Sequence, residues 1–128
     1  MKIRISGQIL QFRLSAQNLD DLEKRRRLEL QIQVTSAMSL NFALIIGESD
    51  GTASEVGLVT SVDRIELTLP GEQFEAWNRS YEIEWELRPA NSSLTFLVEK
   101  DLKDQRTSRG AQSSPSGSTG ESRRDPNR

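Results

Sequence analysis

The chain repeats one apolar pattern after about 55 residues, in segments 3–45 and 58–99. The matching pairs are Phe12 and Leu67, Leu14 and Leu69, Leu19 and Phe74, Leu22 and Trp77, Leu28 and Ile83, Leu30 and Trp85, Ile32 and Leu87, and, after one deleted residue, Phe42 and Phe96. The same offset of 55 residues aligns a strand, a helix and the next strand without a gap. The pattern therefore predicts two equivalent halves that build one shared core.

Each half reads as strand, strand, helix, strand, strand. In the first half we expect strands at residues 2–5, 9–14, 28–34 and 40–46, and a helix that begins after Ser15 and ends within residues 24–27. The Ser15 hydroxyl can accept a hydrogen bond from the first turn of the helix. Leu14 and Leu19 have the spacing of a hydrophobic staple across the strand–helix junction.

The second half repeats this order after a polar loop at residues 48–52. We expect strands at residues 55–60, 64–69, 81–87 and 94–100, with a short helix that begins at Pro70. Proline suits the start of a helix because the first turn leaves its amides unpaired. Phe74 and Trp77 lie three positions apart and should cover the strands as Leu19 and Leu22 do.

This order predicts a mostly β (α+β) fold in which the duplicated ββαββ unit forms a single small closed or partly closed β-barrel with two short helices. Residues 1–102 should form one globular domain made of two pseudo-repeats, 2–46 and 55–100. Residues 103–128 are rich in Ser and Arg and carry no apolar pattern. We expect this tail to be disordered, because it has nothing to bury.

The composition excludes several kinds of chemistry. The chain has no cysteine and no histidine, so thiolate catalysis, disulfides, Cys/His zinc sites and Ser-His-Asp hydrolysis are absent. We expect no cofactor, no metal and no enzymatic activity. The longest apolar run, residues 42–46, is too short to span a bilayer. Without a secretion signal, the cytoplasm is the expected location.

The two halves differ in charge. Residues 1–45 contain seven Lys or Arg and four Asp or Glu, a net charge of +3. Residues 46–100 contain four and eleven, a net charge of −7. Opposite signs on equivalent halves predict a dipolar surface, which can steer a protein partner or a second copy of the chain.

Two clusters of charged residues deserve a functional interpretation. Glu82, Glu84 and Glu86 share one strand face, at a spacing of about 6.8 Å that is near that of a glycosidase pair. Their alternation with Ile83 and Trp85 favours a solvated face, and no sugar cleft is indicated. The candidate binding residues are instead the cations Lys24, Arg25, Arg26, Arg27, Arg4 and Arg13.

These cations suit a helix C-terminus, and they could also contact phosphates of a nucleic acid. Residues 63–70, followed by 71–77 and 81–87, resemble the strand, proline, helix, strand order of the AbrB and MazE swapped-hairpin domains. Those domains assemble as dimers, and the resemblance implies that this chain holds both halves. Nucleic-acid binding remains the less favoured interpretation, because the aromatic residues that could stack on bases are needed in the core.

A closer resemblance covers residues 1–101. Met1-Lys2-Ile3-Arg4-Ile5-Ser6-Gly7, Phe12-Arg13-Leu14-Ser15 and Leu94-Thr95-Phe96-Leu97-Val98-Glu99-Lys100-Asp101 resemble the opening and closing signatures of the DUF7009 family of small bacterial proteins. In that family an aromatic residue and a cysteine tend to follow the closing Glu-Lys-Asp, whereas Leu102-Lys103 follows here. The resemblance implies a fold and brings no activity.

The sequence thus favours a non-enzymatic domain that acts by protein–protein interaction or self-association. The alternative is a nucleic-acid-binding regulator of the AbrB/MazE type that uses the basic residues above. No membrane contact is expected.

Overall fold

A computed structural model describes residues 1–47 and 55–102 of the chain. The predicted loop at residues 48–52 and the predicted disordered tail at residues 103–128 lie outside the described residues. No helix in the described part is long and apolar enough to cross a membrane.

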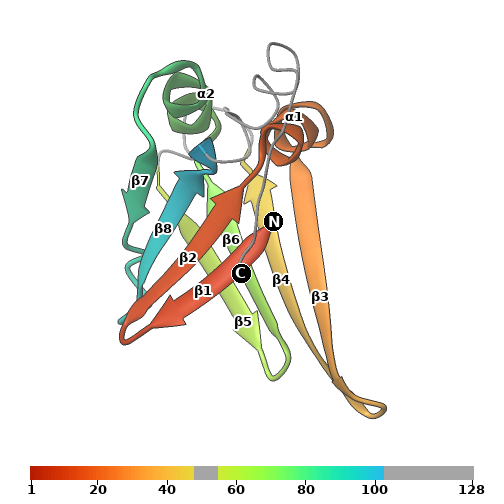
Figure 1. The fold of residues 1–128 in the computed structure, drawn as a ribbon. Coiled ribbons are helices and arrows are strands. Elements are labelled where there is room, and N and C mark those ends of the chain that lie inside the picture. The colour runs from red at the N-terminus through yellow and green to blue at the C-terminus, as the bar shows by residue number, and fades with distance from the viewer. Residues whose placement is uncertain (48–54, 103–128) are drawn as a thin grey trace, which may run out of the picture.

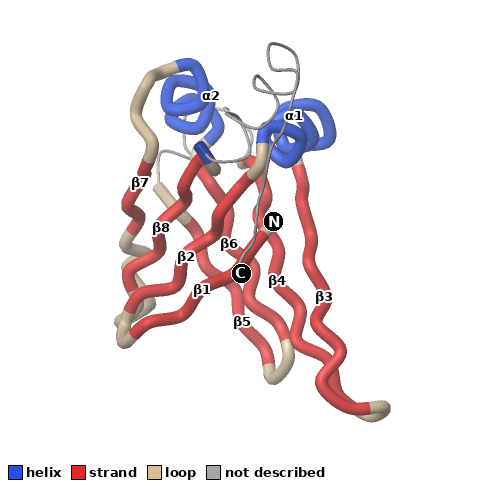
Figure 2. Tube along the Cα trace, in the orientation of Figure 1, coloured by secondary structure: helices blue, strands red, loops and turns tan. Residues whose placement is uncertain are grey.

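The described residues form eight strands and two helices, in the predicted order (Figures 1 and 2). The first half contains β1 (Lys2–Ser6), β2 (Ile9–Leu14), α1 (Ala16–Arg25), β3 (Arg27–Thr35) and β4 (Met38–Ile46). The second half contains β5 (Gly57–Ser61), β6 (Arg64–Leu69), α2 (Gly71–Arg79), β7 (Glu84–Leu87) and β8 (Thr95–Lys100). β7 is shorter than the expected strand at residues 81–87, because residues 81–83 precede the ladder with β8.

The strands form two four-stranded mixed sheets, and each sheet takes one hairpin from each half. Sheet A has the order β1-β2-β8-β7, and sheet B has the order β3-β4-β6-β5. The central strands pair in parallel in both sheets, β2 with β8 and β4 with β6, and the outer pairs are antiparallel. The halves have therefore exchanged hairpins.

A closed barrel, one of the two predicted forms, is not observed in the described residues, because sheets A and B share no strand ladder. Alternation of apolar and polar residues identifies the buried face of each strand but not its neighbours. The two sheets instead pack their apolar faces together, and the helices lie at one end of both sheets (Figure 1).

Equivalent hydrogen bonds recur in the two halves. The Gly47 N–H donates to the Leu69 carbonyl at 2.8 Å, and the Asp101 N–H donates to the Leu14 carbonyl at 2.9 Å. In the same way, the Asn41 N–H donates to the Asp63 carbonyl, and the Thr95 N–H donates to the Gln8 carbonyl. These bonds join the parallel strands of each sheet at equivalent places, so the repeat seen in the apolar pattern extends to the backbone.

The helices begin as the sequence predicts, and they end in different ways. Ser15 caps α1: its hydroxyl accepts from the Asn18 N–H at 3.0 Å, while the Asn18 side chain accepts from the Ser15 N–H. Helix α1 ends at Arg25 and is followed by the capping residue Arg26, which adopts a left-handed conformation with φ 62°. Helix α2 ends at Arg79 and is followed by the capping residue Ser80, whose backbone is extended.

Both helices cover the core with the predicted side chains. The fully or nearly buried cluster contains Leu10, Phe12, Leu14, Leu19, Leu22, Phe42, Leu44, Ile46, Leu67, Leu69, Phe74, Trp77, Leu87, Phe96 and Val98. Its members come from both halves, as the repeat predicts. Burial of such side chains contributes about 1.5–3 kcal/mol each.

Candidate functional site

The outer face of sheet A is divided by charge. One row of cross-strand neighbours runs from Lys2 through Arg13 and Glu99 to Glu84. The next row runs from Arg4 through Gln11 and Leu97 to Glu86. Cations therefore occupy β1 and β2, and carboxylates occupy β8 and β7, across about 14 Å of sheet. Sheet A takes β1 and β2 from the basic first half and β7 and β8 from the acidic second half. Its outer face is therefore basic on one side and acidic on the other.

Like charges are neighbours on each side of this face. Lys2 pairs in register with Arg13, and Glu84 pairs with Glu99. Like charges directly opposite each other destabilise a sheet. Two ion pairs join the two sides, from Arg13 Nε to Glu99 Oε1 at 2.7 Å and from Lys2 Nζ to Asp101 Oδ2 at 4.0 Å. Lys2, Arg13 and Glu99 therefore each have an opposite charge nearby.

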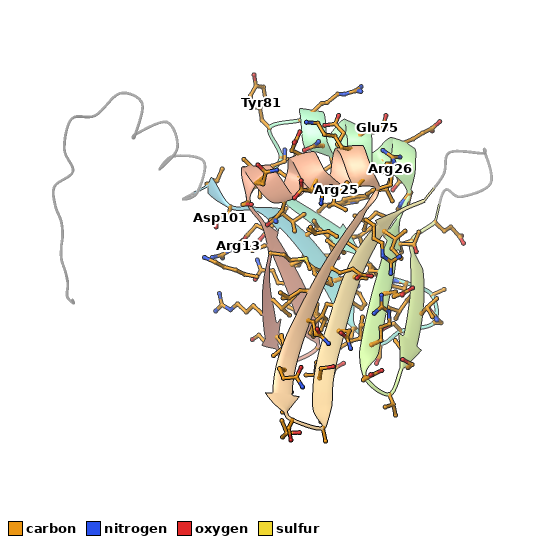
Figure 3. All side chains as sticks on the ribbon, turned by 90° about the vertical axis from the view of Figure 1, so that its right-hand side faces the viewer. Arg13, Arg25, Arg26, Glu75, Tyr81 and Asp101 are labelled. Carbon is orange, nitrogen blue, oxygen red and sulfur yellow. The ribbon has the colours of Figure 1, made fainter. Side chains whose placement is uncertain are left out.

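The six candidate cations do not converge. Arg4 and Arg13 lie on sheet A, Lys24 and Arg25 lie in the last turn of α1, and Arg27 begins β3 on the outer side of sheet B. Figure 3 shows Arg13 on a different side of the molecule from Arg25 and Arg26.

Four of these cations contact carboxylates in the described part of the chain. The partners are Asp20 for Lys24, Glu75 for Arg26, Glu29 and Glu66 for Arg27, and Glu99 for Arg13. The Arg26–Glu75 contact, at 3.6 Å, joins α1 to α2 across the two halves (Figure 3). These contacts make the run a set of separate surface ion pairs rather than one patch.

The three glutamates do not form a catalytic cleft. Glu82, Glu84 and Glu86 are exposed, and Glu86 forms an ion pair with Arg88 at 2.8 Å. Of the three, only Glu86 lines the hollow of about 280 Å³ beside Trp85. The expectation of a solvated face agrees with this placement.

A second charged cluster, which the sequence does not reveal, lies on the outer face of sheet B. Arg27 and Arg64 each contact both Glu29 and Glu66. The hydrogen bonds from these guanidinium groups hold the pKa of both carboxyls below the usual value. In register, Glu29 and Glu66 flank Ala43, whose side chain is fully buried.

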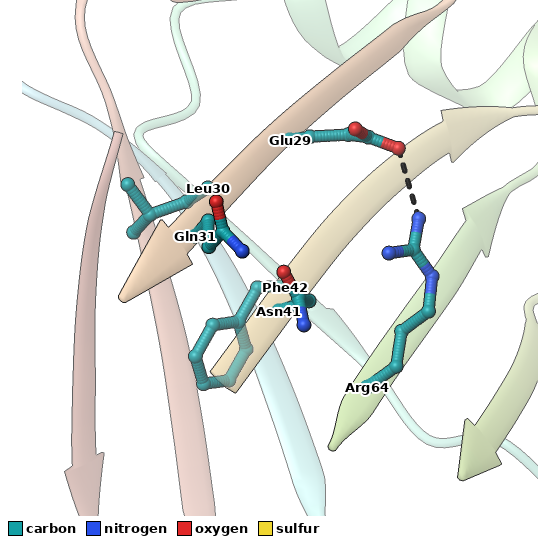
Figure 4. Close-up of a pocket in the computed structure, with 6 residues that line it drawn as sticks. All are labelled: Glu29, Leu30, Gln31, Asn41, Phe42 and Arg64. Atoms are coloured by element: carbon teal, nitrogen blue, oxygen red, sulfur yellow. Dashed lines mark hydrogen bonds and ion pairs between the residues drawn. The ribbon is translucent and has the colours of Figure 1, made fainter. Parts of the chain in front are cut away.

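Beside this cluster lies a polar hollow of about 460 Å³ (Figure 4). Its lining consists of Glu29, Leu30, Gln31, Asn41, Phe42 and Arg64. The amides are already used: Gln31 donates to the Ser39 hydroxyl, and Asn41 donates to the Asp63 carbonyl. Most polar groups that line the hollow already form hydrogen bonds or ion pairs within the protein, so few are available to bind a ligand.

A buried cation near the end of α2 also escaped the sequence analysis. Lys100 is only 7% exposed, and its Nζ donates to the carbonyls of Trp77 at 3.0 Å and Ser80 at 2.7 Å. The same ammonium lies 4.8 Å from the Trp77 ring centroid. Burial lowers the pKa of Lys100, and the nearby Glu82 opposes that shift. The sequence does contain a signal for this burial, because Lys100 occupies the position in the repeat where the first half has the apolar Ile46.

Lys100 nevertheless has a structural explanation. It also lines a hollow of about 210 Å³ with Arg13, Glu99 and Asp101. Its donors, however, are directed at the last carbonyls of α2, where a cation suits the helix dipole. Within the ranges 1–47 and 55–102, no group of three or more acidic residues is arranged to hold a metal ion. The charge-divided face of sheet A remains the best candidate site.

Comparison with known proteins gives one match. The model of a family of unknown function, DUF7009, matches residues 1–115. No curated protein and no solved structure matches the chain. The likeness to AbrB and MazE domains therefore rests on the order and exchange of the elements alone.

Proposed function

Since the chain belongs to DUF7009, a family of unknown function, we propose a role from the face of sheet A itself: the protein is a non-enzymatic domain that binds a protein partner or a second copy of itself. The observation that supports this role is the row Lys2, Arg13, Glu99, Glu84. It places like charges beside each other, Lys2 with Arg13 and Glu84 with Glu99, and a complementary charged surface would pair with each side.

The division makes the face self-complementary. A second copy turned by a two-fold axis brings the cations of β1 over the carboxylates of β7, and the reverse. Such a contact is isologous and closes as a dimer. Because its charges are exposed, we expect it to form at low ionic strength and to weaken as salt screens it.

The decisive test uses charge reversal on each side of the face. The K2E/R4E variant makes both outer strands of the face, β1 and β7, acidic, and the E84K/E86K variant makes both of them basic. Native mass measured at about 0.01 M salt should show that neither variant self-associates by this face, whereas an equal mixture forms a heterodimer. At about 1 M salt the heterodimer should dissociate. The matched control, K24E/R25E, reverses two cations on α1 and should behave as the wild type.

Two results would overturn this proposal. If the mixture stays monomeric at every ionic strength, the face does not join two copies. If wild-type bait and both reversal variants then capture the same proteins equally, the face binds no partner either. An unchanged partner set with the K24E/R25E control is expected in either case.

A nucleic-acid regulator receives less support from the geometry. Its cations lie on sheet A, α1 and sheet B, and four of them contact carboxylates. Nucleic-acid binding can be tested by titration with mixed-sequence DNA at low salt. Binding with a salt slope near −3.6, about that of four phosphate contacts, would favour it over a protein partner.

A further inference from the structure

The ion pairs of the described residues form two groups, one within the halves (residues 1–47 and 55–102) and one between them. Pairs within a half, such as Arg27–Glu29 and Arg79–Glu75, join residues two or four positions apart. In the described residues five ion pairs join the two halves: Lys2–Asp101, Arg13–Glu99, Arg26–Glu75, Arg27–Glu66 and Arg64–Glu29. The first half supplies the cation in all but the last of these.

The charge difference between the halves thus has a use inside the molecule. Contact between two like halves would double the +3 of residues 1–45 or the −7 of residues 46–100, whereas contact between unlike halves cancels part of both charges. The ion pairs between the halves bring these opposite charges together at particular residues. Charge therefore favours the pairing of a first half with a second half.

The repeat also shows what a pairing of two first halves would lack. Glu66 contacts a first-half arginine from β6, and its equivalent in β2 is Gln11. Glu99 contacts another from β8, and its equivalent in β4 is Ile45. In a pairing of two first halves these arginines would face an amide and an alkyl group. Discrimination between partners commonly combines such lost contacts with repulsion between like charges.

Neither half can complete a sheet alone. Each half contributes one hairpin to sheet A and one to sheet B, and the parallel ladders β2–β8 and β4–β6 exist only between the halves. The buried cluster also takes its side chains from both halves. Each half therefore has a large surface that only the opposite half complements, and a second copy of the chain carries that complement too.

We propose that the ion pairs between the halves specify which halves pair, and that two copies of this chain can therefore exchange halves. Each domain of the exchanged dimer consists of the first half of one copy and the second half of the other. It contains the same ion pairs and the same parallel ladders as the monomer. This exchange goes beyond the proposed function, because it uses the contact between the halves rather than the outer face of sheet A.

The wild type should remain unexchanged when it is dilute. Ile45 and Gly57 both pair in register with Thr68, so the end of the first half and the start of the second lie about 10 Å apart. A short tether presents the second half to its own first half at an effective concentration of about a millimolar. A second copy at micromolar concentration competes poorly with it.

Two full-length variants test the exchange without changing the face of sheet A. R26E/R27E reverses two first-half cations, and E66K/E75K reverses their carboxylate partners. Each variant alone brings like charges together in its own domain. In an exchanged dimer the two reversed halves pair with each other, and so do the two native halves. Contacts within a half, such as Arg27–Glu29, are the same in both states and do not affect the choice.

Equal amounts of the two variants, one of them isotopically labelled, are unfolded together, refolded at about 0.1 M salt and examined by native mass measurement. We expect the heterodimer to exceed either homodimer at least about tenfold. The sample is then diluted into about 1 M salt. A contact through the face of sheet A should dissociate there, whereas the exchanged dimer should persist because its halves share one core.

The matched control is a mixture of D20K/E86K with K24E/R88E. These variants reverse the same number of charges, but the pairs Asp20–Lys24 and Glu86–Arg88 each lie within one half. Exchange cannot restore them, so after dilution into high salt this mixture should show no excess of heterodimer.

If R26E/R27E and E66K/E75K do not fold alone, their mixture should still fold, which circular dichroism detects. A mixture that stays monomeric after refolding, a mixture that stays unfolded, or an equal excess of heterodimer in the control would each overturn the proposal. None of these results bears on the face of sheet A, because that contact forms without unfolding and dissociates at high salt.

Discussion

Lys100 occupies in β8 the position that Ile46 occupies in β4. Ile46 pairs in register with Leu69, and Lys100 pairs with the equivalent Leu14. Both side chains are buried, at 4% and 7% exposure. The difference follows from the helix ends: the left-handed Arg26 closes α1 by donating to the Leu22 carbonyl, whereas Lys100 donates to the carbonyls at the end of α2.

Replacing Lys100 by the residue of its repeat partner should therefore destabilise the protein. The K100I variant removes the donor for the Trp77 and Ser80 carbonyls, which should lower the free energy of unfolding by about 1–3 kcal/mol. Urea unfolding of K100I, with the exposed-site variant K24I as control, measures the difference. A K100I protein more stable than the wild type would show that desolvation of the ammonium outweighs its hydrogen bonds.

Lys100 should also leave a signature at alkaline pH. Burial lowers its pKa in the folded state below the 10.5 expected when it is exposed. Between these two values the unfolded chain binds more protons, so the free energy of unfolding should rise with pH in that window. The difference between wild type and K100M, measured from about pH 8 to pH 11, isolates this contribution. Parallel stability curves would contradict the lowered pKa.

The cluster of Arg27, Glu29, Arg64 and Glu66 predicts a response at acid pH. The guanidinium groups lower the pKa of both carboxyls below 4.5. Their stabilisation is therefore complete above that value and is lost as the pH falls through the lower, folded-state pKa. The E29Q/E66Q variant should lose less stability than the wild type between about pH 5 and pH 2. Equal losses on acidification would assign the acid sensitivity to other carboxylates.

Gly71 is required where α2 begins. A Cβ at this position would lie 2.5 Å from the Gly47 carbonyl oxygen, which is too close for any side chain. Alanine normally stabilises a helix relative to glycine, but G71A should destabilise this protein by about 1–3 kcal/mol because the backbone must move. G57A is the control, since its Cβ would lie at an ordinary 3.5 Å from Thr68. Thermal unfolding should separate the two variants, and a stabilised G71A would refute the close approach.

Local features were predictable from the sequence because local physics decides them. Ser15 forms the expected cap, α1 ends within the expected cationic run, and the paired positions Leu22 and Trp77 are both buried. In these cases the residue type and its spacing contain the whole reason for the structure.

The arrangement of the strands could not be predicted in the same way. The alternation in β2 shows that Phe12 points inward, but it does not show that Phe12 lies beside Val98 rather than beside a strand of its own half. The two sheets, the exchanged hairpins and the charge-divided face all depend on such long-range choices. For the candidate site, the sequence indicated a charge difference between the halves and not the face on which the charges meet.

Because the hairpins are exchanged, folding cannot be completed until most of the chain has been synthesised. The central ladder of sheet A joins Leu14 to Lys100, residues separated by most of the described chain. Contacts so distant in sequence make folding slow relative to that of locally connected domains. The first half leaves the ribosome with β2 and β4 lacking their parallel neighbours, and sheet A is complete only after β8 has emerged. An mRNA truncated before the codon for Thr95 would therefore yield a chain with no finished sheet A.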